Sequence, residues 1–246
     1  MSAPVKVRLL IGGQWVDGTR TVPLVDKFRG EPYGEVQQAS REQVLAAIAG
    51  AEAGFRAHKL LPSERGAILD RAAALVLERK AMLEKLMMAE AGFTAADGEN
   101  EVRRCVETLR LSADEARRLE GEMIPMGAAP GVRNRIGYTI RVPRGVVCAI
   151  TPFNSPLNTV AHKLAPALAG GNAVVLKASA FTPATAAELC RALLDAGLPP
   201  GLLALVNGTG EEVGRVLLAD PRIAYYTFTG STRVGIEIQQ AAGLRG

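Results

Sequence analysis

The stretch GVVCAITPFNSPLNTVAHKLAPALAGGNAVVLK, residues 145–177, contains two short apolar runs with a helical segment between them. The runs GVVCAI (145–150) and AVVLK (173–177) have the length of a strand and are rich in β-branched residues. The segment around 157–168 is long enough for a helix, and two consecutive glycines follow it. A strand, a helix and a second apolar strand in this order predict adjacent parallel strands joined by a crossover helix.

The same alternation continues to the C-terminal side. A helix is expected from near Pro183 to Gly197, and the apolar run LLALV (202–206) predicts a third strand. A helix from about Glu211 to Leu218 leads to IAYYTF (223–228), the fourth strand, and a last helix follows Ser231. Because strands that are apolar throughout are buried on both faces, the predicted fold class is α/β, with a Rossmann-like parallel sheet and helices on both faces.

The N-terminal side has a different pattern of predicted strands and helices. Residues 8–16 read as a β-hairpin turning at Gly12-Gly13. Three helices are expected next, the first beginning at Ser40 with a capping box to Gln43. The second is expected from Pro62-Ser63 to Gly92 and the third over roughly 95–119. Residues 123–142 are richer in turn residues and β-formers and predict an extended arm.

We therefore expect three parts along the chain. They are an N-terminal hairpin and helical part of the cofactor domain (1–122), a β arm for oligomerisation (123–144) and a Rossmann-like dinucleotide-binding part (145–246).

Composition excludes several classes of function. The net charge of +4 comes from interspersed signs, and only 4% of residues are aromatic, so the clustered basic and stacking residues of a nucleic-acid binder are missing. Three widely spaced cysteines form no CxxC pair, which argues against a zinc site or a disulfide framework and favours reduced thiols. The N-terminus lacks a signal-peptide core, and no apolar run approaches the roughly 20 residues of a membrane helix. We expect a cytoplasmic protein with no bound metal and no membrane contact.

Four loops follow the four predicted parallel strands. Ligands of open α/β sheets bind at the carboxyl ends of the strands, so these loops are the candidate site. They cover residues 151–156, 178–182, 207–214 and 229–235.

Two of these loops contain glycines that permit close backbone approach. Gly208, Gly210 and Gly214 stand between a strand and a helix, where backbone amides can hold a pyrophosphate, although a tight turn explains them equally well. Gly230-Ser231 before the last helix offers donors to an anion, and the alternative is an ordinary serine N-cap.

The other two loops contain polar side chains. Lys177 ends an apolar strand, where its ammonium can bond ribose hydroxyls or a phosphate, or can simply be solvated. Asn154 is either a turn asparagine or an amide donor for an oxygen that becomes anionic during a reaction.

Taken together, these loops resemble one known family. TPFNSPL (151–157), VVLK (174–177), GxGxxxG (208–214) and FTGSTxVG (228–235) are similar, in order and spacing, to the motifs of the NAD(P)-dependent aldehyde dehydrogenases. The hairpin, the helices and the arm before RVPRGVV (141–147) resemble the same family, so the resemblance covers nearly the whole chain.

The resemblance implies a role for each residue of the loops. It assigns Asn154 as a catalytic oxyanion donor, Lys177 to the adenosine ribose and Ser231 to the pyrophosphate. Binding of NAD or NADP is implied for Ile150, Thr151, Pro152, Phe153, Lys177, Ser179, Ala180, Gly210, Gly214, Phe228, Gly230, Ser231 and Val234.

One departure from the family pattern concerns cofactor choice. Many NAD-preferring members have an acid three residues after the lysine, and this chain has Ala180 there. An acid repels a 2′-phosphate and alanine does not, while Ser179 adds a hydroxyl donor nearby. We expect NADP to be tolerated alongside NAD.

The family reaction also needs residues that the resemblance places further along. A cysteine thiolate attacks the aldehyde, hydride passes to the cofactor, and a glutamate-activated water hydrolyses the thioester to give a carboxylate. The corresponding ELGG and GQxC motifs follow FTGSTxVG in family members, and the sequence here runs to Gly246. Cys105, Cys148 and Cys190 lie in helical or strand patterns and are expected to be buried hydrophobes. We therefore expect the catalytic domain to be absent and the 246-residue chain alone to be inactive and prone to associate.

Substrate and partners follow only from the resemblance. Ser155, His162, Arg103 and Arg104 occur near the family's substrate entrance and suit a small hydroxylated or anionic aldehyde of the lactaldehyde, glyceraldehyde or phosphonoacetaldehyde type, although the arginines also fit a solvated helix face. A homodimer or tetramer is expected for a full-length form. Two alternatives remain, a CoA-acylating aldehyde dehydrogenase half and a non-catalytic nucleotide-binding remnant.

Overall fold

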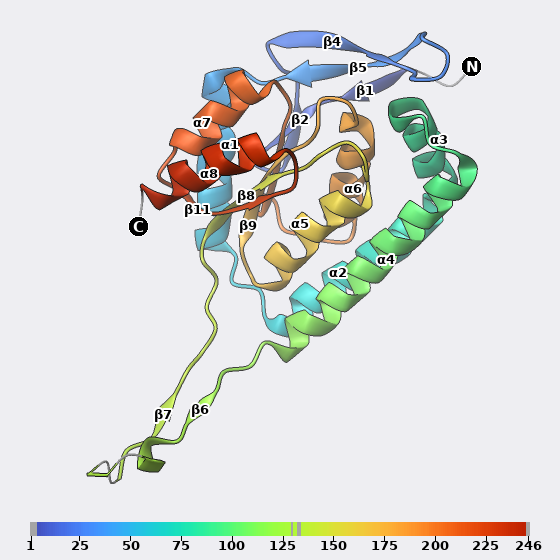
Figure 1. The fold of residues 1–246 in the computed structure, drawn as a ribbon. Coiled ribbons are helices and arrows are strands. Elements are labelled where there is room, and N and C mark those ends of the chain that lie inside the picture. Colours follow the sequence, from blue (N-terminus) through green and yellow to red (C-terminus); the bar gives the residue numbers. More distant parts are fainter. Residues whose placement is uncertain (1–3, 129, 132–133, 245–246) are drawn as a thin grey trace.

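The computed structural model describes residues 4–128, 130–131 and 134–244. Figure 1 shows a layered α/β body from which a long two-stranded arm projects. The expectation that the catalytic motifs are missing referred to the end of the sequence at Gly246. That residue lies outside the described residues.

The main sheet contains the four predicted parallel strands as neighbours. Its order is β11-β8-β9-β10-β2-β3, with β8 Val146–Ile150, β9 Ala173–Lys177, β10 Leu203–Val206 and β11 Ile223–Phe228. The first three are almost entirely buried because helices cover both sheet faces. The prediction of an α/β fold with a Rossmann-like parallel core is confirmed.

The N-terminal hairpin is part of this sheet. Its strands β2 Leu9–Ile11 and β3 Gln14–Val16 turn at Gly12 and Gly13, which both have positive φ, as a two-residue hairpin turn requires. Leu10 pairs with Leu205 in antiparallel orientation. The prediction of a purely parallel sheet was therefore incomplete, because pairing between residues almost 200 positions apart leaves no local pattern.

A second sheet was not predicted. Strands β1 Val5–Val7, β5 Pro32–Gln38 and β4 Arg20–Val25 form it in that order. β1 has three residues, β4 is largely exposed and interrupted by Pro23, and β5 has only two buried residues, so they lack the continuous apolar pattern that identified the main sheet.

The helical layer follows the predicted order with one correction. Helix α1 Arg41–Ala57 has Ser40 as N-cap with the predicted capping box to Gln43, and α4 spans Ala95–Arg118. The single helix expected between Pro62 and Gly92 is two helices, α2 Pro62–Glu78 and α3 Lys80–Ala91. Arg79 leaves helical geometry at φ −90° and ψ 8° without a glycine or proline to mark the break, so four helices precede the arm instead of three.

The remaining helices cover the sheet. Helices α5 Asn158–Ala169 and α6 Pro183–Asp195 pack on one face, and α1 covers β8, β9 and β10 from the other (Figure 1). After β10 the chain forms one π-helical turn, Gly210–Gly214, before the short α7 Arg215–Ala219. Helix α8 is Thr232–Gly243, at the C-terminal end of the described chain. The helix expected from Glu211 to Leu218 thus begins with a wider turn than predicted.

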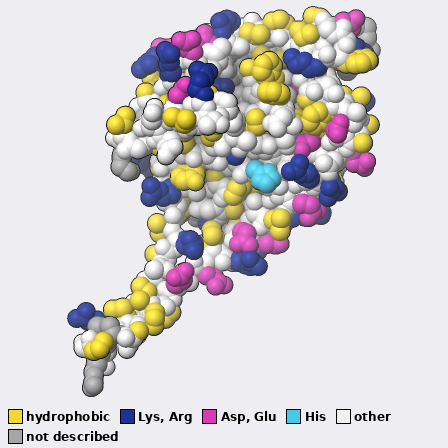
Figure 2. All heavy atoms as spheres, viewed as in Figure 1, with side chains coloured by type: hydrophobic (Ala, Val, Ile, Leu, Met, Phe, Trp, Pro, Cys, Tyr) yellow, Lys and Arg dark blue, Asp and Glu magenta, His cyan; other side chains and the backbone are white. Residues whose placement is uncertain are grey.

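The arm extends far from the body. Its strands β6 Met123–Ile124 and β7 Gly137–Tyr138 pair antiparallel and leave Met123, Ile136 and Tyr138 at least two-thirds exposed. Figure 2 shows that hydrophobic side chains gather along it. Among the described residues, no helix is long and apolar enough to cross a membrane.

Candidate functional site at the carboxyl edge of the sheet

The four predicted loops meet at one edge of the sheet. Ile150, Lys177 and Val206 are register partners at the ends of β8, β9 and β10. The backbone N–H of Thr151 donates to Lys177 O at 3.4 Å, and that of Thr229 donates to Ile150 O at 3.2 Å. The loops after β11, β8, β9 and β10 therefore lie side by side in that order. Residues 207–214 and 229–235 are at opposite ends of the row, about 14 Å apart at the usual strand spacing.

Asn154 lies in the loop between β8 and α5. It is exposed, and no described residue forms a hydrogen bond with its side chain. Phe153 beside it is 54% exposed and packs edge-on against Phe181 of the next loop, with ring centroids 5.3 Å apart. The Asn154 amide is thus available to a ligand in a loop that its neighbours hold in place.

The residues after Asn154 are held by a buried carboxylate from α4. Glu101, 4% exposed, accepts hydrogen bonds from Ser155 Oγ at 2.7 Å, from Leu157 N at 3.2 Å and from Asn158 N at 3.0 Å. Two of these donors are backbone amides at the start of α5, where a helix has no partners of its own. Glu101 therefore caps α5 and fixes the residue next to Asn154.

A polar cluster extends from Glu101 along the α4–α5 contact. Arg104 Nη1 lies 3.6 Å from Glu101 Oε1. With its amide oriented to satisfy its neighbours, Asn158 donates to Thr108 Oγ1 at 2.9 Å and accepts from His162 Nε2 and Arg104 Nη2, each at 3.2 Å. Burial, followed by the nearby cations, lowers the pKa of His162, which leaves Arg104 as the permanent positive charge of this cluster. Arg103 instead bonds Asn100 on the exposed face.

The strand ends on either side of Lys177, which is the last residue of β9, carry polar atoms that lack partners. Burial lowers the pKa of its ammonium, whose hydrogen bond within the described chain goes to Ala178 O at a long 3.4 Å. On the strands to either side, the buried Thr151 Oγ1 and both amide atoms of the buried Asn207 side chain have no hydrogen-bond partner. Buried polar groups are almost always paired, so these orphans indicate a place where a polar ligand binds or approaches.

The loop after Lys177 leads into α6. Ser179 Oγ accepts from Phe181 N at 3.2 Å, while Ala180 places no charge at the loop. The start of α6 is capped by Glu90 of α3, which accepts from Ala184 N, Thr185 N and Thr185 Oγ1 at 2.6–2.8 Å. Burial raises the pKa of this carboxyl.

The two outer loops present open backbone. A Cβ at Gly210 or Gly214 would meet no atom within 4 Å, so neither glycine is required by internal packing. Gly230 differs, because a Cβ there would come 2.5 Å from the ring of Phe228. Ser231 caps α8 by accepting weakly from Val234 N at 3.5 Å, so its hydroxyl acts as an ordinary N-cap while remaining exposed.

The residues present fit an adenine dinucleotide on these observations. A weakly bonded ammonium, orphaned polar atoms on the adjacent strand ends, the exposed Gly210 and a buried Gly214 with room for a Cβ suit a ligand with ribose hydroxyls and phosphates. In the described ranges, no group of three or more His, Cys, Asp or Glu side chains could hold a metal ion.

The three cysteines do not contribute to this site. All are free and buried, as the sequence predicted. Burial raises the pKa of the Cys148 and Cys190 thiols to about 12 and that of Cys105 further, so none forms a thiolate nucleophile near neutral pH.

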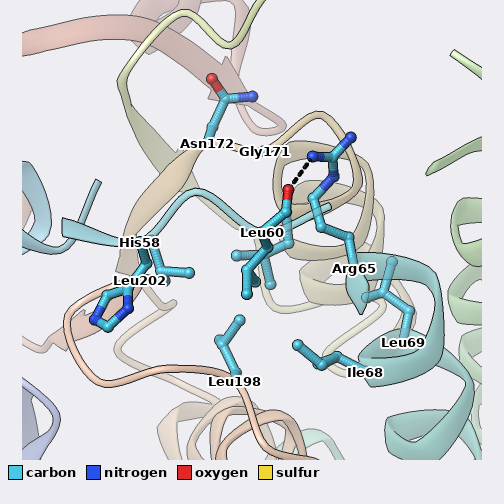
Figure 3. A pocket seen from close by; sticks show the side chains of 10 residues that line it. His58, Leu60, Arg65, Ile68, Leu69, Gly171, Asn172, Leu198 and Leu202 are labelled. Carbon is cyan, nitrogen blue, oxygen red and sulfur yellow. Dashed lines mark hydrogen bonds between the residues drawn. The ribbon is translucent and has the colours of Figure 1, made fainter. Parts of the chain in front are cut away.

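A separate small pocket lies at the opposite edge of the sheet, between α2 and the end of α5. Figure 3 shows Arg65 donating to Leu60 O at 2.7 Å above the apolar side chains of Ile68, Leu69 and Leu198. Arg65 also bonds Ala169 O at 2.7 Å, so its guanidinium serves to close the C-terminus of α5. This pocket is a packing feature away from the four loops.

Comparison with known proteins identifies the class. A family model described as the aldehyde dehydrogenase family matches residues 15–246, and the chain belongs to this family. The computed structure superimposes with a TM-score of 0.93 on the NADP-dependent glyceraldehyde-3-phosphate dehydrogenase of Bacillus halodurans in complex with NADP, at 34% identity, covering 97% of this chain and 51% of that one.

Two of the relatives are named after small polar aldehydes. The chain is 41% identical over 237 residues to the 3-sulfolactaldehyde dehydrogenase of Priestia megaterium, covering 96% of this chain and 50% of the relative. It is 37% identical to the D-glyceraldehyde dehydrogenase (NADP(+)) of Thermoplasma acidophilum, covering 96% of this chain and 48% of the relative. The chain thus spans about half the length of the curated relatives it matches.

Sequence reasoning missed three residues at this edge, namely Glu90, Glu101 and Asn207. Asn207 stood within a loop that the sequence singled out, directly after an apolar strand, and that position was its signal. Glu101 and Glu90 look like ordinary polar positions on amphipathic helices, and only packing shows that they are buried.

Proposed function

We propose that the protein carrying this chain oxidises a small polar aldehyde to the carboxylate with NAD or NADP, and that the four-loop edge is its cofactor site. The observation that carries the proposal is the free, exposed amide of Asn154 beside a strand edge lined by the weakly bonded Lys177 and the orphaned side chains of Thr151 and Asn207. Family membership supplies the reaction class.

Each part of the edge has a task in this proposal. A bound nicotinamide cofactor would supply the hydride acceptor. The Lys177 ammonium would bond ribose hydroxyls, the backbone at Gly210 and Gly214 would let the adenine end approach, and Ser231 with Gly230 would support the pyrophosphate. Ile150, Thr151, Pro152, Phe153, Phe228 and Val234 would line the cofactor. The remaining sequence-predicted contacts, Ser179 and Ala180, would lie beside the ribose.

Asn154 acts on the substrate. When the nucleophile of the intact enzyme adds to the aldehyde carbon, the carbonyl oxygen becomes an alkoxide, and the Asn154 N–H groups donate to it. An oxyanion donor of this kind contributes about 3 kcal/mol of transition-state stabilisation. Asn154 has no competing partner in the described chain, so no hydrogen bond has to be broken before this donor acts.

The substrate proposed is a small hydroxylated or anionic aldehyde. The Arg104 guanidinium contacts both Asn158 and Glu101, and Glu101 in turn bonds Ser155, so a positive charge lies close to the Asn154 loop. The names of the sulfolactaldehyde and glyceraldehyde relatives agree with such a substrate.

The experiment that tests the function uses the native gene product with D-glyceraldehyde, succinate semialdehyde and hexanal. We expect reduction of NADP⁺ or NAD⁺ with the first two, a lower kcat/KM for hexanal, and, in Arg104→Met, a loss of kcat/KM that is larger for succinate semialdehyde than for D-glyceraldehyde. An enzyme that prefers hexanal contradicts the substrate class, and one that reduces neither cofactor contradicts the function.

Cofactor choice is tested at the loop after β9. We expect the wild-type chain to bind both NADP⁺ and NAD⁺, because Ala180 does not repel a 2′-phosphate. Ala180→Glu should weaken NADP⁺ binding about 10-fold or more and spare NAD⁺, while Ala180→Gln, of similar size without charge, should change the ratio little. Isothermal titration of both cofactors measures this, and a large NAD⁺ preference in the wild type contradicts it.

The three-part division, the partners and the compartment complete the proposal. Residues 1–122 and 145–246 form the cofactor part, and the arm within 123–144, with its exposed Met123, Ile136 and Tyr138, contributes to a homodimer or tetramer of the full-length form. Three free, buried thiols suit the reducing cytoplasm. Replacing Met123, Ile136 and Tyr138 by serine should lower the oligomeric state seen by light scattering, and an unchanged mass contradicts the role of the arm.

A further inference from the structure

The residue next to Asn154 is tied to a different layer of the fold. Ser155 Oγ donates to Glu101 Oε1 at 2.7 Å, and Glu101 Oε2 accepts from Leu157 N and Asn158 N at 3.2 and 3.0 Å. Three donors within four consecutive residues therefore converge on one carboxylate of α4. Asn154 itself bonds no described residue through its side chain, and Ser155, the residue after it, is attached to Glu101.

We propose that Glu101 is a positioning residue that holds the Asn154 amide where the oxyanion forms, by clamping the three donors that follow it. This inference rests on the proposed role of Asn154 and assigns no contact between Glu101 and substrate. The carboxylate is 4% exposed, so water does not compete for its oxygens, and both are occupied.

The alternative role for Glu101 is purely structural, as a cap that stabilises α5. A matched control separates the two roles. Glu90 is equally buried and caps α6 through Ala184 N, Thr185 N and Thr185 Oγ1, but its donors belong to the helix and none adjoins Asn154. Removing either glutamate should therefore lower the stability of the fold. Only the removal of Glu101 should also lower kcat, because only Glu101 bonds the residue next to Asn154.

The test compares Glu101→Ala, Glu101→Gln, Ser155→Ala and Glu90→Ala in the native gene product, with D-glyceraldehyde and NADP⁺ as probes. Glu101→Ala should lower kcat about 30-fold and change KM for NADP⁺ less than 3-fold. Glu101→Gln should recover most of kcat, because its oxygen can accept from the two amides while its NH₂ donates to a reoriented Ser155 hydroxyl. Ser155→Ala, which removes one of the three bonds and is expected to fold, should lower kcat about 5-fold.

The decisive measurement is a double-mutant cycle with Asn154→Ala. If Glu101 acts through Asn154, Glu101→Ala should lower kcat less than 3-fold in the Asn154→Ala background, whereas independent effects multiply. A full 30-fold loss in that background, or an equal kcat loss in Glu90→Ala, overturns the proposal. If Asn154→Ala alone leaves kcat unchanged, it is the oxyanion role of Asn154 that fails.

A second readout needs no turnover. In the native gene product, amide hydrogen exchange of residues 151–159 should increase at least 10-fold in Glu101→Ala, with residues 183–187 unchanged, and the reverse should hold in Glu90→Ala. If residues 151–159 of a folded Glu101→Ala variant exchange their amide hydrogens at the wild-type rate, Glu101 does not hold this loop. That result overturns the proposal, whichever substrate the native gene product oxidises.

Discussion

The starts of α5 and α6 are built alike and serve different ends of the candidate site. Each helix is capped by a buried glutamate from the helical layer, Glu101 for α5 and Glu90 for α6, and each carboxylate accepts two backbone N–H groups and one hydroxyl. At α5 the hydroxyl belongs to Ser155, ahead of the helix and beside Asn154. At α6 it belongs to Thr185, inside the helix.

That difference decides what each cap can influence. The α5 cap holds a loop residue in place, and Arg104 lies 3.6 Å from its carboxylate. The α6 cap holds helix residues only, and burial raises the pKa of Glu90. The same electrostatic device, an acid at a helix N-terminus, thus holds a loop residue in one case and helix residues alone in the other, and the placement of one hydroxyl distinguishes the cases.

The largest expected effect tests the α5 side of this comparison. Asn154→Ala in the native gene product should lower kcat about 100-fold or more through loss of an oxyanion donor. Affinity for NADP⁺ and the melting temperature should stay near wild-type values. Steady-state kinetics measure the change, and a kcat within 3-fold of wild type would remove the reason for treating the α5 loop as catalytic.

A substitution on the α6 side should lower the stability of the fold instead of kcat. Glu90→Ala leaves Ala184 N and Thr185 N without acceptors in a buried place, which should lower the free energy of unfolding by about 3 kcal/mol. Urea denaturation of the native gene product measures this loss. Thr94→Ala, a substitution at the exposed N-cap of α4, provides the control and should cost about 1 kcal/mol.

Lys177, at the end of the strand that leads to α6, tests cofactor binding on the α6 side of the comparison. Lys177→Met should weaken NADP⁺ binding about 10-fold, because the ammonium loses its bonds to the cofactor while the apolar stem is preserved. Since burial lowers the Lys177 pKa, wild-type binding should also weaken as pH rises, with a midpoint below the usual lysine pKa of 10.5, because the ammonium then loses its proton. Titration calorimetry across pH checks both, and a pH-independent wild type or an unaffected variant counts against Lys177 as a ligand.

The smallest effect concerns the protonation of Glu90. Burial raises its folded-state pKa above 4.5, so the folded chain holds this proton more tightly than the unfolded chain. The stability that this proton contributes is complete below pH 4.5 and is lost as pH rises through the raised pKa, with a slope of at most about 1.4 kcal/mol for each pH increment of one. Glu90→Gln should lack this part of the pH dependence. Equal differences in unfolding free energy between the two proteins at every pH would refute it.

Local patterns predicted the elements that their own residues specify. The four apolar strands, the Ser40–Gln43 capping box and the left-handed Gly92 that ends α3 were all read correctly, because each depends on residues within a few positions of one another. The break at Arg79 and the π-helical turn at Gly210–Gly214 were missed, since neither follows from helix propensity.

The candidate site likewise has a part that could be predicted from local sequence patterns and a part that could not. Its four loops could be predicted because parallel strands place their carboxyl ends at one edge. Their connection to α3 and α4 could not be predicted, since Glu90 and Glu101 reach across 94 and 54 residues to their first partners.

The sequence by itself determined the family, the succession of strands and helices along the chain and the four loops that follow the parallel strands, because these depend on short motifs and on hydrophobic periodicity. The tertiary structure alone decided that the hairpin extends the main sheet, that the side chains of Thr151 and Asn207 are buried without partners, and that Glu101 bonds the residues after Asn154. The physical reason is burial: a glutamate on a helix and an asparagine after a strand acquire their roles only when distant segments exclude water from them and leave specific hydrogen-bond partners, or none.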